Sequence, residues 1–312
     1  MFKYSAIGFV LHRKCSASCD ICCFSSSPES EECLDVDNVR RLIEESNQYP
    51  DIRSISFTGG EIFLDIDKLS MLVEVANSCG KKATCVTNGF WATGYSSTVE
   101  KLKGLQSLGL KVLHVSCDEF HLKYIPIENI NNILLACQEI NMPVAVNILI
   151  LNESDASDTI RRFDSRLANL SLQISSCLPV GLAESKYPYG CFKRTLTPEH
   201  RFCPYDGIIS VSYDGSVYPC FSQFVRDTAL SLGNFIELSL SDIFSKIKNN
   251  ALLYLLRNGS MDFFIGISRK LDINVPERIT SPCELCSLFF SSKNIVRFLP
   301  YVREEMHRRG LA

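Results

Sequence analysis

The sequence predicts an α/β fold, in which a partial (βα)6 barrel of the TIM type precedes a smaller region that is rich in cysteine. Two observations support this. Strand-like and helix-like segments alternate from residue 5 to residue 176, with connections short enough for βαβ units. After Ser176 the alternation stops, and turn-forming residues dominate 178–202. Repeated parallel crossovers of this kind build either an open doubly wound sheet or a barrel.

Apolar patterning places six strands and five helices in the first half of the chain. The expected strands are residues 5–12, 52–57, 82–87, 111–117, 143–151 and 170–176. The expected helices are residues 35–48, 67–78, 96–109, 126–140 and 157–169. Gly80, two residues after the helix 67–78, and Gly109, the last residue of 96–109, are expected to stop these helices.

The C-terminal half does not show the alternation of strands and helices. Residues 207–220, "GIISVSYDGSVYPC", predict a hairpin with Asp214 and Gly215 in its turn. Helices are expected over 239–257 and 293–309, and "SPCELC" is expected to form a tight turn. The predicted domains are 1–185 for the barrel, 186–202 for a connection and 203–312 for the cysteine-rich region.

Composition narrows the function classes. The chain has 312 residues, of which 46% are hydrophobic, so it can bury a large core. Its formal charge of −3 gives no electrostatic reason to expect nucleic acid as a partner. No apolar run approaches the roughly 20 residues of a membrane helix. The odd number of cysteines, 15, fits poorly with complete disulfide pairing, so we expect a cytoplasmic protein with reduced thiols.

The segment "KCSASCDICCFSSSP" holds Cys15, Cys19 and Cys22 at C-x3-C-x2-C spacing, with Cys23 directly after them. Three small apolar residues on one helix face would show the same spacing. However, the segment is polar and follows a strand, where the active sites of α/β proteins assemble. Three thiolates on such a loop can hold an iron–sulfur cluster and leave one iron open.

C-x3-C-x2-C after the first strand resembles the signature of the radical S-adenosylmethionine (SAM) enzymes, in which SAM chelates the open iron. The residue before the last cysteine is usually aromatic in that family, and here it is Ile21. A second match is "SFTGGEIF" at the end of the second strand, where Gly59, Gly60 and Glu61 correspond to the family's SAM-binding motif. Two glycines let the backbone approach a ligand closely, and a carboxylate suits an ammonium group.

The resemblance covers residues 5–180 and implies a partial (βα)6 barrel that binds SAM and one [4Fe–4S] cluster. It also implies SAM contacts from residues at other strand ends. By this resemblance, polar groups of SAM would be bound by Asn88, Ser116, Asp118 and Asn147, and adenine would be bordered by Leu178 to Val180. Each of these residues could instead cap a loop or make a buried hydrogen bond.

A second set of cysteines comprises Cys203, Cys220, Cys283 and Cys286. Four cysteines with one C-x2-C pair could bind zinc. "CPYDGIISVSYDGSVYPC" instead resembles the auxiliary-cluster modules of radical SAM enzymes, called SPASM and, in shortened form, twitch. The full module uses more cysteines than this part of the chain has, so the resemblance favours the shortened form, a small C-terminal domain with a single auxiliary [4Fe–4S] cluster.

"CCFSSSP" and "VSCDEFHLKYIPIENI" resemble the radical SAM peptide epimerases, which convert L-residues to D-residues in ribosomally synthesised peptides. There the 5′-deoxyadenosyl radical removes a Cα hydrogen, and a cysteine thiol returns hydrogen to the opposite face. Cys220 is the leading candidate for that thiol, with Asp206 nearby. If Cys220 is a cluster ligand instead, the donor is to be sought among Cys117, Cys177 and Cys191.

The expected partners are a precursor peptide and a reductant such as flavodoxin or ferredoxin. The sequence starts at the first strand, so we expect the peptide to be held by the barrel mouth and the C-terminal module. The rival reactions are thioether or carbon–carbon crosslinking of a peptide and oxidation of a side chain. A non-enzymatic iron–sulfur or zinc protein, with a regulatory or assembly role, is the alternative from another class.

Overall fold

The computed structural model describes residues 3–152, 155–168, 170–205 and 207–311. They form two compact units. The first unit extends to Lys193 and also includes Val211–Gly215. The second unit comprises Arg194–Ser210 and the chain from Ser216 onward.

A parallel sheet of six strands forms the centre of the first unit. Its strands are β1 (Ala6–Val10), β2 (Ser54–Thr58), β3 (Lys82–Thr87), β4 (Leu110–Ser116), β5 (Val144–Ile150) and β6 (Ser171–Ser176). They lie in the order β6-β5-β4-β3-β2-β1, and each neighbouring pair is parallel. Among the described strands β1 and β6 are not paired, so the sheet stays open. The predicted partial barrel is therefore confirmed.

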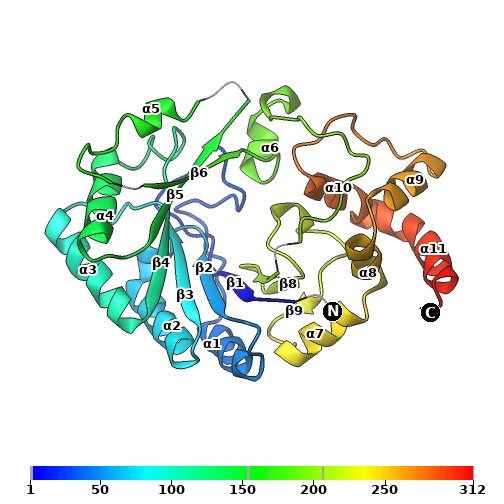
Figure 1. Ribbon diagram of the computed structural model, residues 1–312, viewed down its shortest axis with the longest axis horizontal. Helices are drawn as coiled ribbons and strands as arrows, with labels where there is room; N and C mark the ends of the chain where they lie inside the picture. The colour runs from blue at the N-terminus through cyan, green and yellow to red at the C-terminus, as the bar shows by residue number, and fades with distance from the viewer. Residues whose placement is uncertain (1–2, 153–154, 169, 206, 312) are drawn as a thin grey trace. The chain divides into compact units, whose positions relative to one another are not determined.

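Helices connect these strands, as parallel crossovers require. They are α1 (Val36–Glu45), α2 (Ile66–Ser78), α3 (Tyr95–Leu108), α4 (Ile127–Glu139), α5 (Ser157–Ile160) and, after the last strand, α6 (Leu182–Lys186). Figure 1 shows α1 to α4 side by side along one face of the sheet. Asp35 begins α1 by accepting a hydrogen bond from the Asn38 amide with its side chain.

The core of the first unit is built from alternate residues of its strands. Ile7 and Phe9 of β1 and Ile55 and Phe57 of β2 are fully buried. Phe9 and Phe57 are register partners, and their rings stack with centroids 6.2 Å apart. Strands buried on both faces read as continuous apolar runs, which is why β1 was visible in the sequence.

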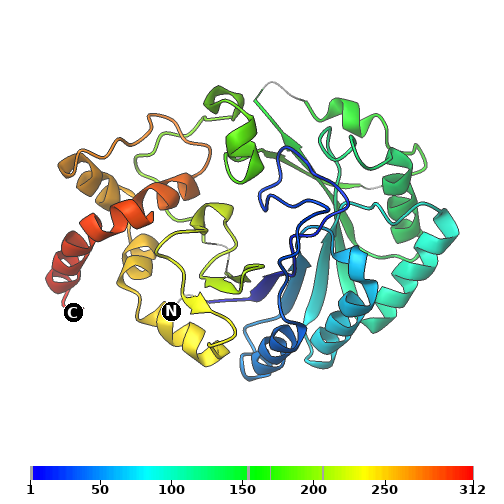
Figure 2. The same cartoon turned by 180° about the vertical axis from the view of Figure 1, so that it is seen from behind.

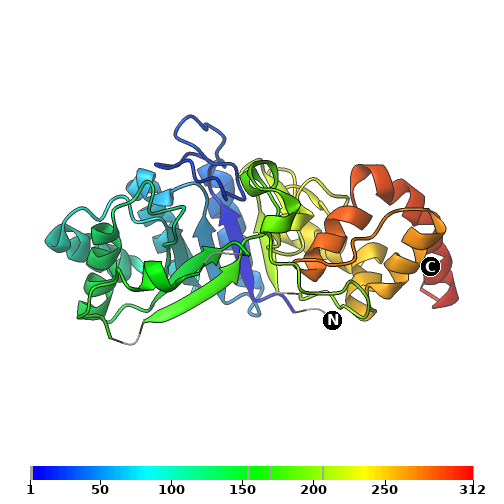
Figure 3. The ribbon, with the colours of Figure 1, turned by 90° about the horizontal axis from the view of Figure 1, so that it is seen from above.

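Because all six strands are parallel, their carboxyl ends lie at one edge of the sheet. The loop that follows β1, drawn in dark blue, extends from this edge and lies beside α6 in Figures 2 and 3. Ligands of open α/β sheets bind at the carboxyl ends of strands. This edge is therefore where the cysteine loop and the other strand-end residues assemble.

The second unit is mainly helical. Its strands are β7 (Ile208–Val211), β8 (Ser216–Tyr218) and β9 (Gly233–Asn234). The last residue of β7, Val211, is counted with the first unit. Its helices are α7 (Leu240–Lys248), α8 (Ala251–Asn258), α9 (Asp262–Lys270), α10 (Pro282–Phe289) and α11 (Ser292–Arg308). Phe264, Phe289 and Phe298 form its buried aromatic core. Gly215, with φ of +83°, makes the predicted hairpin turn.

Three local predictions were wrong. "SPCELC" lies in α10, not in a turn, because the Ser281 side chain accepts from the Cys283 amide and Pro282 starts the helix. The helix expected over 239–257 is two helices, since Asn250 caps a new one. The helix expected over 157–169 ends at Ile160. The Asn131 side chain donates to the Arg162 carbonyl and accepts from the Asp164 amide, so these backbone groups do not bond within a helix.

None of the described helices combines the length and apolar character needed to cross a bilayer.

Replacing Phe57 by alanine is expected to lower the free energy of unfolding by about 3 to 5 kcal/mol, because it leaves a cavity under β1 and β2. Urea denaturation measures this loss. The matched control is Leu64→Ala, which removes an apolar side chain that is 40% exposed and should cost roughly 0.5 kcal/mol or less. Equal losses in the two variants would contradict the assignment of the core.

Candidate active site

The cysteine loop, residues 12–33, leaves the end of β1 and is closed at its base by backbone contacts. His12 pairs with Cys33 in an antiparallel bridge, and Lys14 pairs with Ser27 in a parallel one. The Cys15 amide donates to the Ser27 carbonyl over 3.0 Å. The loop is irregular between these contacts, so the three cysteines of the motif do not lie on a helix.

Arg13 holds the far arm of this loop. Its Nε donates to the Phe24 carbonyl over 3.0 Å, and its Nη2 donates to the Ser25 carbonyl over 2.8 Å. The guanidinium also pairs with Glu32 at 2.5 Å and lies 5.2 Å from the ring centroid of Tyr213. Ser25 has a positive φ of +51°, and the hydrogen bond to its carbonyl helps to hold that unusual conformation.

The thiols of Cys15, Cys19 and Cys22 lie on this one loop, and their charges act on one another. Burial raises the pKa of Cys15 to about 11, and the charges of Glu61 and Cys22 contribute to the rise. Burial raises the pKa of Cys19 well above its usual range, and the charges of Cys15 and Cys22 raise it further. Thiolates whose negative charges repel one another are stabilised by a positively charged iron centre, and binding of the iron is coupled to deprotonation of the thiols.

Within the described ranges, no three His, Cys, Asp or Glu side chains are placed to bind a single metal ion. A cluster differs from such a site because each thiolate binds a different iron atom. Three soft sulfur donors on one irregular loop, with an asparagine amide beside one of them, therefore fit an iron–sulfur cluster with one iron open to a ligand.

Gly59 and Gly60 pack directly against the backbone that precedes Cys15. The Gly60 amide donates to the His12 carbonyl over 2.7 Å, and the next amide, of Glu61, donates to the Lys14 carbonyl over 2.9 Å. A Cβ on Gly60 would lie 2.0 Å from the Lys14 carbonyl oxygen, and one on Gly59 would lie 2.6 Å from that of His12. The sequence predicted close approach to a ligand, and the structure shows close approach to the cysteine loop.

The Glu61 carboxylate is fully buried and has three donors within the protein. Oε1 accepts from the Phe63 amide and the Thr87 hydroxyl, and Oε2 accepts from the Asn88 amide over 2.6 Å. Burial raises the pKa of Glu61 to about 7, against the opposing effect of these hydrogen bonds. The side chain thus ties the end of β2 to the end of β3, and its predicted contact with the amino group of SAM stays a prediction.

Asn88 extends this connection to the cysteines. Its Nδ2 lies 3.6 Å from Cys15 Sγ and donates to the Ser16 hydroxyl over 3.1 Å. Its Oδ1 accepts from the Phe90 amide. A continuous chain of hydrogen bonds therefore runs from Glu61 through Asn88 to the first cysteine of the motif.

Asp118 is buried at the end of β4. Its Oδ1 accepts from the amides of Phe120 and His121 and contacts His121 Nδ1 at 2.8 Å, and its Oδ2 accepts from the Leu149 amide. Burial raises the pKa of Asp118, but His121 and the amides outweigh it, so the net pKa lies below the usual value. Asp118 therefore fixes the loop after β4 to β5.

The remaining predicted SAM contacts lie at the same edge of the sheet. Ser116 and Asn147 are register partners on β4 and β5 and are both half-buried. Leu178 and Val180 are half-buried after β6, and the Val180 amide donates to the Leu178 carbonyl. The predicted catalytic residue Asp206 lies outside the described residues.

An apolar cluster seals the inner side of the cysteine loop. Its buried members are Ala17, Cys19, Ile21, Phe120, Cys177, Ala183 and Phe192. Gly181 brings α6 against the loop, since a Cβ there would lie 2.5 Å from the Cys22 carbonyl oxygen and its φ is +59°. The Leu182 amide donates to that same carbonyl over 3.0 Å. Ile21, the departure from the family pattern, is thus part of the packing between loop and barrel.

The second set of cysteines converges within the second unit. Burial raises the pKa of Cys286 well above its usual range, and the charges of Cys283, Cys203 and Cys220 raise it further. The four cysteines thus belong to one unit and interact electrostatically with one another. Arg194 and Glu284 form a buried ion pair at 2.6 Å, and Glu284 also accepts from Thr280, so the start of α10 is fixed. Four soft thiol donors in one place fit an iron–sulfur cluster.

Gly60→Ala is expected to displace the cysteine loop, because the added methyl group would occupy the position of the Lys14 carbonyl. We expect iron uptake during anaerobic reconstitution to fall by about half, with loss of the SAM-binding cluster and retention of the auxiliary one. The control is Gly104→Ala in α3, where a Cβ meets no atom within 4 Å. Normal iron content in Gly60→Ala would show that the backbone contact is dispensable.

Glu61 also predicts a pH dependence of stability. The unfolded chain loses this proton near pH 4.5 and the folded chain near pH 7, so between these values only the folded state holds it. The contribution of Glu61 to the free energy of unfolding of the cluster-free chain should therefore fall by about 3 kcal/mol as pH rises from 4.5 to 7. His12 and His114, whose pKa values burial lowers, contribute in the opposite direction. Urea denaturation across this range isolates the Glu61 contribution as the difference between the wild-type chain and Glu61→Gln, whereas Glu74→Gln, on the exposed side of α2, should keep the wild-type pH dependence.

Comparison with known proteins identifies two domains. A family model described as the radical SAM superfamily matches residues 9–163, and one described as an iron–sulfur cluster-binding domain, SPASM, matches residues 203–287. The YydG protein of Bacillus subtilis (strain 168), named for peptide biosynthesis, is 29% identical over 304 residues. This similarity covers 94% of this chain and 95% of YydG.

Solved structures share the fold. The structure of anSMEcpe with bound AdoMet has a TM-score of 0.58 at 13% identity and covers 97% of this chain and 99% of its own. Streptococcus suis SuiB bound to the precursor peptide SuiA has a TM-score of 0.57 at 13% identity and covers 92% of this chain and 76% of its own. Together with the two family matches, these findings confirm the family and the cofactors that the cysteine and glycine motifs predict, namely SAM, a SAM-binding [4Fe–4S] cluster and an auxiliary cluster. The chain belongs to the radical SAM superfamily and carries a C-terminal SPASM domain.

Proposed function

We propose that this radical SAM enzyme is a peptide epimerase, which converts L-residues to D-residues in a ribosomally synthesised precursor peptide. In this proposal Cys15, Cys19 and Cys22 hold the SAM-binding cluster, Cys203, Cys283 and Cys286 hold the auxiliary cluster, and Cys220 is the hydrogen donor. When bound, the SAM-binding cluster would supply one electron for the reductive cleavage of SAM, which yields a radical able to remove a hydrogen atom from carbon. The residues of the chain orient SAM and the peptide and exclude water.

A peptide as substrate is supported by the relatives. YydG matches this chain over nearly its whole length and is named for peptide biosynthesis. SuiB, which shares the fold, was solved with a precursor peptide. Such similarity favours a peptide over a small molecule but does not by itself distinguish one peptide modification from another.

The observation that supports the epimerase proposal is that one epimerase-like segment is part of the cysteine loop and the other contacts that loop. "CCFSSSP" forms the far arm of the cysteine loop, and "VSCDEFHLKYIPIENI" runs from the end of β4 into α4; both resemble peptide epimerases. The second segment contacts the cysteine loop, because the Tyr124 hydroxyl donates to the Ser18 carbonyl over 2.7 Å and Lys123 pairs with Asp20 at 3.4 Å. The epimerase-like features therefore belong to one site, at the carboxyl edge of the sheet.

In the proposed reaction Cys220 returns the hydrogen. The Cα–H bond of the L-residue breaks first, and its hydrogen atom leaves with the SAM-derived fragment. The S–H bond of Cys220 then breaks as a new C–H bond forms on the opposite face of the same carbon. The sulfur is restored by one electron from a reductant of the flavodoxin or ferredoxin type and one proton from water. The peptide keeps its mass and composition.

The alternative within this proposal keeps Cys220 as a cluster ligand and assigns the return to another thiol. Burial raises the pKa of Cys117 to about 12 and that of Cys177 to about 11, so both keep the S–H bond that a hydrogen donor needs. Cys177 packs with Cys19 in the apolar cluster. Cys191, at the end of a short 3-10 turn, is half-buried.

The test is incubation of the reconstituted enzyme with SAM, reductant and a short peptide encoded beside its gene, in D2O. Mass spectrometry should show one added deuterium per event and no other change, because the thiol exchanges with solvent before it returns hydrogen. Amino-acid analysis after hydrolysis should find the D-isomer. Net loss of two hydrogens would exclude epimerisation and establish crosslinking or oxidation.

Cys220→Ser separates the two roles of that residue. If Cys220 is the hydrogen donor, the variant should keep the wild-type iron content, about eight atoms per chain, and still cleave SAM, but it should return no deuterium to the peptide. Loss of about half of the iron would identify Cys220 as a ligand instead. The control is Cys79→Ser at the end of α2, where the thiol accepts a hydrogen bond from Asn47 over 3.4 Å. Both iron and deuterium incorporation should be unchanged there.

A further inference from the structure

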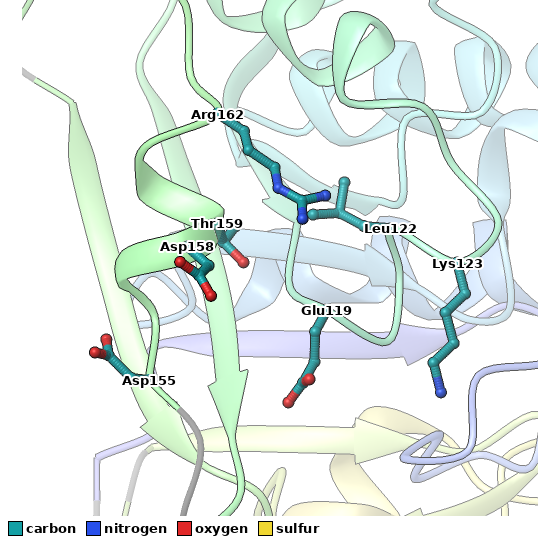
Figure 4. A pocket seen from close by; sticks show the side chains of 7 residues that line it. All are labelled: Glu119, Leu122, Lys123, Asp155, Asp158, Thr159 and Arg162. Atoms are coloured by element: carbon teal, nitrogen blue, oxygen red, sulfur yellow. The ribbon is translucent and has the colours of Figure 1, made fainter.

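A charged cavity opens between the loop that follows β4 and the segment around α5. Its volume is about 620 Å3, within the range of roughly 300 to 1,000 Å3 that is usual for ligand sites. Figure 4 shows the side chains that line it, which are Glu119, Leu122, Lys123, Asp155, Asp158, Thr159 and Arg162. The first three come from the β4 loop and the other four from the α5 segment, so each wall belongs to a different βα connection.

Both walls are fixed to the barrel. Asp118, next to Glu119, binds the Leu149 amide of β5 with its carboxylate. On the other wall Thr159 is buried, and the Asn131 side chain of α4 donates to the Arg162 carbonyl. The cavity is therefore preformed, and a ligand would not have to order its walls.

The cavity adjoins the cysteine loop. Lys123 lines it and also pairs with Asp20, which lies between Cys19 and Cys22 of the motif. The wall that contains Lys123 thus contacts the segment on which the thiols are placed. A ligand in this cavity would lie beside the site of chemistry, at the edge where parallel strands end.

The charges of the lining are only partly neutralised. Lys123 pairs with Asp20, Asp158 pairs with Arg161, and Asp155 accepts from the amide and hydroxyl of Ser157. The Asp155 carboxylate is held by Ser157 but keeps its negative charge. Glu119 and Arg162 come from opposite walls, and among the described residues neither side chain has a hydrogen bond or an ion pair.

A lining with both signs of charge selects a ligand with both signs. A carboxylate matches the planar guanidinium of Arg162, and an ammonium group matches Glu119. A wholly apolar ligand would desolvate these charges without compensation. Because the two groups belong to separate walls, they would also distinguish the direction in which a chain with one acidic and one basic residue is bound.

We propose that this cavity is a subsite for the substrate peptide that binds an acidic side chain at Arg162 and a basic side chain at Glu119, and so sets the direction of the peptide. The proposal rests on the proposed function, since it takes a peptide as the substrate. It adds a specificity determinant outside the cysteine loop and the residues predicted to contact SAM.

The test measures binding and needs no turnover. The probes are blocked octapeptides of glycine and alanine that carry one lysine and one glutamate, separated by one to three residues, and a neutral fluorophore. A second set has the two charged residues exchanged. Fluorescence anisotropy at low salt compares the two orders on the reconstituted, SAM-loaded chain.

At the best spacing, the wild-type chain should bind peptides with one order of the two charged residues about five- to tenfold more tightly than peptides with the other order. In the favoured order each charged residue faces a group of opposite charge, and in the other order it faces a group of like charge. The exchange variant Glu119→Arg/Arg162→Glu should reverse this preference. The matched control is Arg40→Glu/Glu44→Arg, which exchanges an exposed ion pair on α1 and leaves the net charge unchanged. This control should keep the wild-type preference.

Equal affinity for both orders at every spacing, or an unchanged preference in the Glu119/Arg162 exchange variant, would overturn the subsite. This failure differs from failure of the proposed function. Deuterium incorporation into a peptide together with no order preference would remove the subsite alone. A reversible order preference without any peptide modification would support the subsite and remove the epimerase assignment.

Discussion

The architecture of the site depends on one contact between two backbones. The double glycine after β2 lies against the chain that leaves β1, and the amides of Gly60 and Glu61 donate to the carbonyls of His12 and Lys14. No side chain fits between these segments, since a Cβ on Gly60 would overlap the Lys14 carbonyl. The contact sets where Cys15 emerges. It also places Glu61 so that its carboxylate can collect donors from the end of β3, and the cysteine loop and the next two strand ends become one hydrogen-bonded assembly.

The sequence was informative where a physical requirement acts on neighbouring residues. Strands buried on both faces appear as apolar runs, and helices between them appear as periodic segments, so the order of β1 to β6 followed from the pattern. The cysteine spacing and the double glycine are short motifs with strong geometric constraints, and both identified the family. The SPASM domain followed from the spacing of Cys203 and Cys220 about the hairpin turn.

The remaining features depend on contacts between distant residues, which one sequence does not reveal. Arg13 looks like an ordinary basic residue, yet it holds two carbonyls of the loop arm. Gly181 lies among turn-forming residues, and only its approach to Cys22 shows why glycine is required there. Local signals also competed: the side chain of Asn131 replaced helical hydrogen bonds after Ile160, and Ser281 with Pro282 started a helix where a turn was expected.

The bond from the Leu182 amide to the Cys22 carbonyl has a consequence for biosynthesis. The segment that completes the packing of the cysteine loop is synthesised about 160 residues after the loop itself. Contacts of such long sequence separation form late, because the intervening chain must first be ordered. The cysteine loop therefore cannot reach its final packing until β6 and the start of α6 have been synthesised.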